Sequence, residues 1–360
     1  MKFVDEFRRG EVAKRFVESI KERARDGKMT FMEVCGTHTM AIARNGIREL
    51  LPENITLISG PGCPVCVTPN RTVDNAIALS RRPDVIVTTF GDMMKVPGST
   101  SNLDREHARG GDVRIVASTL EALAIARKHP EKRVVFLGVG FETTAPTVAA
   151  SLVEAKRQNI ENYFVLSAHK VMPPAMESLS KGEVKIDGYI CPGHVSAIIG
   201  SRPYEFLSEK FGIGCVVAGF EPLDILQGIL MLVEQMRSGK PKVEIQYSRV
   251  VKPDGNSTAQ DVIYKVFESC DSEWRGIGSI PKSGLKIRDE FVSWDAEIQV
   301  PVDVEPTRKP KGCLCGQVLQ GIVKPPECRH FGKSCTPGNP VGPCMVSTEG
   351  TCAAYYKYRT

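Results

Sequence analysis

The sequence predicts an α/β protein in which two similar domains, each built on a parallel sheet, face each other across a cleft and are followed by a cysteine-rich domain. Short apolar runs recur at intervals of about 22–30 residues, each followed by a turn and a helical pattern, as βα units require. These runs do not alternate with polar residues, which is typical of parallel strands buried on both faces. Six cysteines lie within residues 313–352.

The expected elements follow one another along the chain. Residues 1–27 should form a helix, because apolar residues recur at roughly helical spacing among charges, at Val4, Phe7, Val12, Phe16 and Ile20. A first set of strands is expected at 29–34, 55–59, 85–90 and 113–117, and a second set at 134–139, 163–167, 188–191 and 215–218. Beyond these, 242–247 is strand-like, 259–270 is helical and 301–311 reads as a linker.

The two consecutive sets of strands predict the domain boundaries. We place the first α/β domain at 23–126, the second at 127–238, and a third domain at 1–22 plus 239–360. A short similarity between the sets favours an old duplication: Gly60-Pro-Gly-Cys63 in the first is similar to Cys191-Pro-Gly-His194 in the second.

Composition argues against several classes of function. Lys and Arg exceed Asp and Glu by only 47 − 42 = 5, so the charge gives no support to nucleic-acid binding. No apolar stretch reaches the ~20 residues that cross a bilayer, and the charged N-terminus has no apolar signal core. We therefore expect a cytoplasmic protein without membrane contact, in which clustered cysteines serve metal or redox chemistry.

The densest group of cysteines lies near the C-terminus, in a Gly- and Pro-rich segment that cannot build a packed core alone. Four thiolates suffice for a [4Fe–4S] cluster, so the third domain is expected to carry one. A zinc site is an alternative, although its usual paired knuckles are missing, and a disulfide knot is another, although it suits a secreted chain. The group comprises Cys313, Cys315, Cys328, Cys335, Cys344 and Cys352.

A second thiol site is expected upstream. Cys35 follows the first strand and opens a helix, where the partial positive charge of the N-terminus favours the thiolate, and His38 lies one turn along. Cys63 and Cys66 follow the second strand in the same way. Because neighbouring parallel strands end at one sheet edge, the three thiols should converge and could hold iron, copper or zinc. The alternative is a redox pair at Cys63 and Cys66, with Cys35 a buried small hydrophobe.

Polar residues in other loops define a third candidate region. Glu142, His169, Lys170 and His194 each follow an expected strand, so they would line the cleft between the two domains, where ligands bind. This grouping favours a proton-handling or anion-binding cleft. Simple helix or turn capping is the competing interpretation for Glu142 and for each histidine.

Eight long motifs resemble those of the HypD family of hydrogenase maturation proteins, in order and over almost the whole chain. They are FMEVCGTHT, GPGCPVCVTP, TTFGDMMKVPGS, GVGFETTAPT, SAHKVMPP, CPGHVSAIIG, AGFEPLDIL and CMVSTEGTCAAYY. The resemblance implies a scaffold on which the Fe(CN)2CO unit of [NiFe]-hydrogenase is assembled. It also implies a HypC-type small chaperone that shares the iron, and HypE, working with HypF, as the cyanide donor.

The resemblance further implies roles for individual residues. Cys35 and Cys66 would hold the iron that receives cyanide and carbon monoxide, with Cys63 and His38 close by and also needed. The cluster environment would be similar to that of ferredoxin:thioredoxin reductase, with Cys315 and Cys344 as a redox-active pair. The cluster ligands would be Cys313, Cys328, Cys335 and Cys352.

The implied chemistry is reductive. Cyanide would arrive as a protein-bound thiocyanate, and the two electrons that release it from sulfur would come from the cluster and the Cys315/Cys344 pair. Whether a scaffold of this kind counts as an enzyme stays open. The rival interpretation is a thiol–disulfide reductase in which Cys63 and Cys66 reduce a protein substrate, although such an activity does not need two α/β domains with polar loops.

Overall fold

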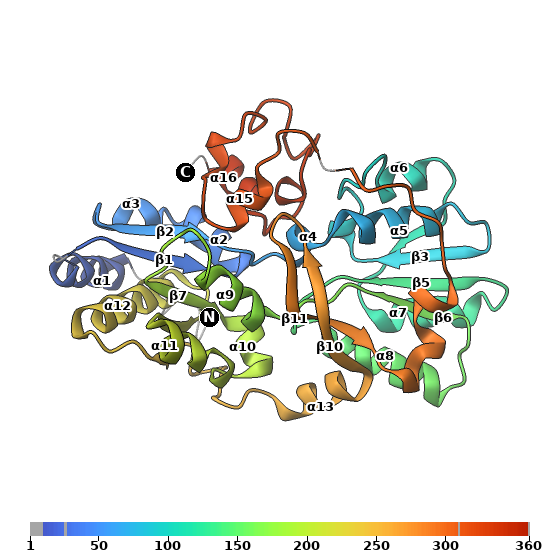
Figure 1. The fold of residues 1–360 in the computed structure, drawn as a ribbon, viewed down its shortest axis with the longest axis horizontal. Helices are drawn as coiled ribbons and strands as arrows, with labels where there is room; N and C mark the ends of the chain where they lie inside the picture. The colour runs from blue at the N-terminus through green and yellow to red at the C-terminus, as the bar shows by residue number, and fades with distance from the viewer. Residues whose placement is uncertain (1–9, 25–26, 309, 359–360) are drawn as a thin grey trace.

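The computed structural model describes residues 10–24, 27–308 and 310–358. Two parallel sheets lie at opposite ends of an elongated molecule, an antiparallel hairpin stands between them, and the C-terminal segment packs above the centre (Figure 1). This arrangement confirms the expected α/β class with parallel sheets. No helix in the described part of the chain is long and apolar enough to cross a membrane.

The first sheet has five parallel strands in the order β2-β1-β7-β8-β9. Ile20 of the first described helix, Phe31 of β1 and Leu226 of α12 are almost completely buried in the core beneath this sheet. Val4 and Phe7, assigned to the same N-terminal helix from the sequence, lie outside the described residues. The elements are α1 (Gly10–Arg23), β1 (Met29–Glu33), α2 (Gly36–Arg44), α3 (Ile47–Leu50), β2 (Ile55–Ser59), α4 (Pro64–Val67), β7 (Gly188–Pro192), α10 (Gly193–Ile199), α11 (Glu205–Phe211), β8 (Gly214–Ala218), α12 (Pro222–Ser238) and β9 (Val243–Ile245).

The second sheet has four parallel strands in the order β4-β3-β5-β6. Strands β3, β5 and β6 are almost entirely apolar and buried, as parallel strands covered on both faces must be. Its elements are α5 (Asn70–Ser80), β3 (Val85–Thr89), α6 (Leu103–Ala108), β4 (Val113–Ile115), α7 (Thr119–Lys128), β5 (Arg133–Gly138), α8 (Ala145–Arg157), β6 (Tyr163–Ser167) and α9 (Met172–Ser180).

The pairing of strands differs from the expected grouping of consecutive sets. β3 and β4, assigned to a domain at 23–126, pair with β5 and β6, so a boundary at 126/127 divides the second sheet. β7 and β8, assigned to a domain at 127–238, join β1 and β2 in the first sheet. The chain leaves the first sheet after β2, builds the second and then returns. The similar motifs at Cys63 and His194 thus follow strands of one sheet, not equivalent strands of two domains.

The remaining chain joins the two sheets. Helix α13 (Ser257–Val266) leads into the hairpin of β10 (Phe267–Trp274) and β11 (Gly278–Ile287), so the helix expected at 259–270 ends earlier and Cys270 lies in a strand. The hairpin docks beside β6, since Val171 donates to the Ser283 carbonyl at 3.0 Å. After α14 (Ala296–Gln299), the C-terminal segment forms α15 (Cys315–Leu319) and α16 (Thr351–Tyr358) among turns.

Candidate thiol sites

The loops that carry Cys35 and Cys63 meet at the carboxyl edge of the first sheet. β1 and β2 are parallel neighbours, so their following loops lie side by side. The backbone N–H of Gly36 donates to the Gly62 carbonyl at 3.0 Å. A Cβ atom on Gly62 would lie only 2.3 Å from the Cys35 nitrogen, so only glycine allows this approach. The sheet edge therefore brings the two cysteine loops together, as their positions after neighbouring strands predicted.

Burial, rather than the helix N-terminus, decides the protonation of Cys35. Cys35 is the N-cap of α2, and the nearby backbone N–H groups of Thr37 and His38 lower the pKa of its thiol. Burial, reinforced by the carboxylate of Glu349, nevertheless raises the pKa of Cys35 to about 12. The expected thiolate at the helix N-terminus is therefore wrong for the metal-free thiol. A soft metal ion could still displace the proton, because metal binding and thiol deprotonation are coupled.

His38 is held as a neutral side chain beneath the loop of Cys35. Its Nε2 donates to the Gly219 carbonyl at 2.9 Å and lies 3.2 Å from the Ala218 carbonyl oxygen. Burial lowers the pKa of His38 to about 4, so it carries no positive charge near neutral pH. Its Nδ1 is buried without a hydrogen-bond partner. The lone pair of this atom is free to accept a proton or a metal ion.

His194 lies at the same sheet edge as Cys35, not across a cleft from it. It occupies the first turn of α10, directly after β7, which pairs with β1. Its ring stacks on Phe220 at 4.0 Å between centroids, and His38 contacts the same phenyl ring at 4.8 Å. Phe220 thus contacts both histidines at the carboxyl edge.

The C-terminal segment covers this edge through Glu349. Its carboxylate accepts a hydrogen bond from the Thr37 hydroxyl at 2.7 Å. A Cβ atom on Gly36 would lie 2.4 Å from the Glu349 Cβ, so the residue after Cys35 packs directly on the C-terminal segment. The two thiol regions that the sequence presents as separate are therefore in contact.

Cys66 provides the second connection between the two regions. The backbone N–H of Cys66 donates to the Cys63 sulfur at 3.3 Å, and the Cys66 thiol adjoins the thiol of Cys344. Burial raises the pKa of Cys66 well above its usual value. Cys344 in turn adjoins Cys315 and Cys352. A continuous series of thiols thus runs from the Cys63-x-x-Cys66 turn into the C-terminal segment.

The other C-terminal cysteines surround this series. The sulfurs of Cys313 and Cys315 lie 3.3 Å apart, and a Cβ atom on Gly342 would collide with both. Cys335 receives the backbone N–H of Val341 at 3.3 Å. Cys328 lies at the periphery, where its thiol is 3.9 Å from the carbonyl oxygen of Gly312. A cavity of about 350 Å³ opens beside Cys313 and Cys315, so solvent or a partner can reach this side.

The donor set suits a multi-iron cluster better than a single ion. Within the residues that the structure describes, no three Cys, His, Asp or Glu side chains are arranged to hold one metal ion. The thiols instead gather around one another, and soft thiolates are the ligands that iron–sulfur clusters use. The chemistry of the C-terminal cysteines therefore fits such a cluster.

Glu142 and His169 lie at the carboxyl edge of the second sheet. Glu142 accepts a hydrogen bond from the Met172 backbone at 2.9 Å, and its other carboxylate oxygen has no partner. His169 contacts the Ser167 hydroxyl at 3.2 Å through Nδ1, and burial lowers its pKa to about 3. No hydrogen bond or ring contact among the described residues joins either side chain to the thiols of the two cysteine regions.

The buried carboxyl of Glu142 predicts a pH dependence of stability. Burial raises its pKa to about 7 from 4.5, so the folded state binds an extra proton between these values and loses stability as the pH rises through them. Glu142→Gln keeps the acceptor for Met172 and removes this loss. We expect the variant to gain on the order of 2 kcal/mol relative to the parent between pH 4.5 and 7.5, measured by urea unfolding. Parallel pH profiles for the two proteins would contradict the prediction.

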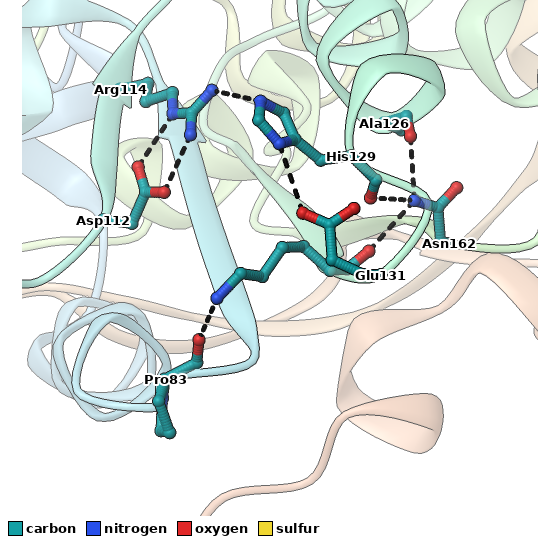
Figure 2. Close-up of polar contacts among 8 residues, drawn as sticks. Pro83, Asp112, Arg114, Ala126, His129, Glu131 and Asn162 are labelled. Atoms are coloured by element: carbon teal, nitrogen blue, oxygen red, sulfur yellow. Dashed lines mark hydrogen bonds and ion pairs between the residues drawn. The ribbon is translucent and has the colours of Figure 1, made fainter.

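Polar groups at the amino edge of the second sheet serve structure instead. Figure 2 shows Asp112, His129 and Glu131 near one another, a set that could be mistaken for a metal site. Asp112 is held by Arg114 through two hydrogen bonds of 2.8 Å. Asn162 donates to the carbonyls of Ala126, His129 and Lys132, each at 2.9 Å. These contacts tie the loops that precede the strands to one another.

Sequence reasoning missed four residues near the thiols. Glu33 lies buried in β1 and accepts a hydrogen bond from the Cys35 backbone at 3.3 Å. An ionisable residue within an otherwise apolar strand could have indicated a functional position. Phe220 contacts His38, Glu349 accepts a hydrogen bond from Thr37, and Arg275 lies near the thiols of Cys66, Cys315 and Cys344. Each of these contacts joins distant segments, so no local pattern reveals it.

Comparison with known proteins gives consistent results. The family model named HypD, described as "Hydrogenase formation hypA family", matches residues 11–359. The hydrogenase maturation factor HypD of Cupriavidus necator is 48% identical over 99% of this chain and 97% of its own length. HypD of Escherichia coli K12 is 45% identical over 100% of this chain and 98% of its own. The hydrogenase expression/formation protein HupD of Azotobacter chroococcum is 44% identical over 99% and 97%, respectively.

Proposed function

Because the chain belongs to the HypD family of hydrogenase maturation factors, we propose that it is the scaffold on which the Fe(CN)2CO unit of [NiFe]-hydrogenase is assembled. The observation that carries the proposal is the packing of α4, which carries Cys66, against the Pro343–Met345 turn, which carries Cys344. This packing joins the upstream thiols to the C-terminal cysteines. A scaffold that must hold iron and also reduce an incoming ligand needs both functions in one place.

The upstream site would hold the iron that is the cargo. Cys35 and Cys66 are its proposed ligands, with Cys63 next to Cys66 and His38 one turn after Cys35. Both ligand thiols are buried with raised pKa values, so the iron itself would drive their deprotonation. A buried site also excludes water and oxygen from the iron.

The C-terminal site would supply the reducing equivalents. Cys313, Cys328, Cys335 and Cys352 are the proposed ligands of a [4Fe–4S] cluster, which when bound delivers single electrons. Cys315 and Cys344 are the proposed redox-active pair. For cyanide carried as a thiocyanate on a partner cysteine, the balanced step is R–SCN + two thiols → R–SH + HCN + one disulfide. The pair gives up two electrons, the S–CN bond breaks, and cyanide is released beside the iron ligand Cys66.

The proposed partners follow from this chemistry. A HypC-type chaperone would share the iron, and HypE with HypF would deliver the cyanide. Among the described residues, no hydrogen bond or ring contact joins Glu142 or His169 to the thiols of the two cysteine regions. We therefore do not assign Glu142 or His169 to the transfer step, and we keep His194, which lies at the thiol edge, as a candidate for proton handling there.

The test is a metal and infrared analysis of protein that is co-produced with its partners and purified without oxygen. We expect iron and about four acid-labile sulfides per chain, together with cyanide and carbonyl stretching bands. Sulfide without these bands would favour the alternative, a thiol–disulfide reductase that uses the same contact between Cys66 and Cys344. Zinc without sulfide would reject both functions.

A further inference from the structure

We propose that Arg275, at the tip of the β10–β11 hairpin, is a positioning residue that holds the end of helix α4 in place so that Cys66 stays against Cys344. The contacts of Arg275 with α4 do not depend on the proposed function, but a role of Arg275 in cyanide transfer rests on that function. Figure 1 shows the hairpin rising between the two sheets toward α4 and the C-terminal segment.

Arg275 caps the carboxyl end of α4 with both its backbone and its side chain. Its backbone N–H donates to the carbonyl of Val67 at 2.8 Å, and its Nε donates to the carbonyl of Thr68 at 2.7 Å. Its two terminal nitrogens reach the Pro97 carbonyl at 3.4 and 3.5 Å. Since Cys66 immediately precedes Val67, these bonds fix the turn that presents the Cys66 thiol.

The same hairpin tip contacts the segment that carries Cys315. Gly276 has a φ of +77°, and a Cβ atom there would lie 2.3 Å from the Cα of Gly316. The Gln320 side chain donates to the Gly276 carbonyl at 3.0 Å. One tight turn therefore touches the residues next to Cys66 and next to Cys315, and it sets the separation of the two segments.

The hairpin is anchored well enough to act as a fixed reference. Trp274 is fully buried, donates to the Ser283 hydroxyl at 2.8 Å and stacks on Phe141 at 5.9 Å. The guanidinium of Arg275 lies near the thiols of Cys66, Cys315 and Cys344, and burial lowers its pKa. A guanidinium stays charged in proteins and has donors in a rigid fork, so it can bind several carbonyl groups at once.

The test measures the separation of the two thiols directly. Dibromobimane becomes fluorescent when it bridges two thiols, and peptide mapping identifies the bridge between Cys66 and Cys344. In Arg275→Met, which keeps an apolar stem, we expect the rate of this bridge to fall at least about fivefold, with the anaerobic full-length protein as reference. Arg275→Lys should behave like Arg275→Met, because its single nitrogen lies at the end of the stem and cannot replace both the Nε that binds Thr68 and the terminal nitrogens that bind Pro97.

Arg288 offers a matched control. At the far end of the same hairpin its backbone N–H donates to Val266, the last residue of α13, at 2.9 Å, and its Nε donates to the Phe267 carbonyl at 3.1 Å. Arg288→Met should therefore lose a similar cap and yet keep the bridging rate within about twofold. A parent-like rate in Arg275→Met, or an equal fall in Arg288→Met, would overturn the proposal.

A second variant covers the case in which Arg275→Met does not fold. Gly276→Ala keeps the arginine but introduces strain and a collision with Gly316, so it should also slow the bridge; a parent-like rate would count against the role of the tip. None of these measurements uses hydrogenase activity. If the parent protein lacks the cyanide and carbonyl bands, the proposed scaffold function is rejected. The role of Arg275 is decided separately, by the bridging rates alone.

Discussion

Replacing Cys35 with serine is expected to abolish the cyanide and carbonyl bands and to reduce hydrogenase maturation at least about 100-fold. The serine hydroxyl is almost the same size as the thiol, but it is a hard ligand that keeps its proton, whereas the buried thiol can bind iron as a soft thiolate. The variant should fold, because the contacts of this loop with Gly62 and Glu349 are made by the backbone of Cys35 and by its neighbour Gly36.

The matched control for this experiment is Cys215→Ala. Cys215 is equally hidden from solvent, in β8 of the same sheet, but it lies within the core and away from the carboxyl edge. Its loss should cost about 1 kcal/mol of stability and leave the infrared bands intact. If Cys35→Ser keeps the bands, or if both variants lose them, Cys35 is not a ligand of the iron.

The positions of strands could be predicted from the sequence, whereas their partners could not. The apolar runs at 163–167 and 188–191 coincide with β6 and with almost all of β7, because a strand that is buried on both faces consists of apolar residues. Which run lies beside which is decided by packing of whole sheets. For that reason β7 was assigned to the wrong set, and His194 was placed across a cleft from Cys35 although both lie at one edge.

The thiol site shows the same division between local and distant information. The meeting of the Cys35 and Cys63 loops followed from one rule, that adjacent parallel strands end at the same edge. The hydrogen bond between Thr37 and Glu349 joins residues 312 positions apart, and neither segment's sequence predicts it. The pKa of Cys35 was misjudged for a related reason: the helix terminus is visible in the sequence, but the burial that outweighs it comes from other segments.

Cys313 and Cys315 provide the sharpest test of the C-terminal site, since they should give opposite spectra from neighbouring positions. Both thiols are partly buried, and their sulfurs lie only 3.3 Å apart, so alanine at either position removes a similar volume from the same surroundings. If Cys313 is a cluster ligand, Cys313→Ala should lose most of the broad visible absorption and the acid-labile sulfide. If Cys315 belongs to the redox pair, Cys315→Ala should keep both.

Both variants should lose cyanide ligation, but for different reasons that can be separated. Cys313→Ala removes the source of electrons together with the inorganic group that stabilises a segment poor in apolar contacts, so limited proteolysis should cut its C-terminal segment faster than that of the parent. Cys315→Ala leaves Cys344 without a partner for the disulfide, while the segment stays folded. The thiol of Cys315, not that of Cys313, adjoins Cys344, which in turn adjoins Cys66, and this favours Cys315 for the redox pair. An intact cluster in Cys313→Ala together with a lost cluster in Cys315→Ala would contradict this assignment and exchange the two roles.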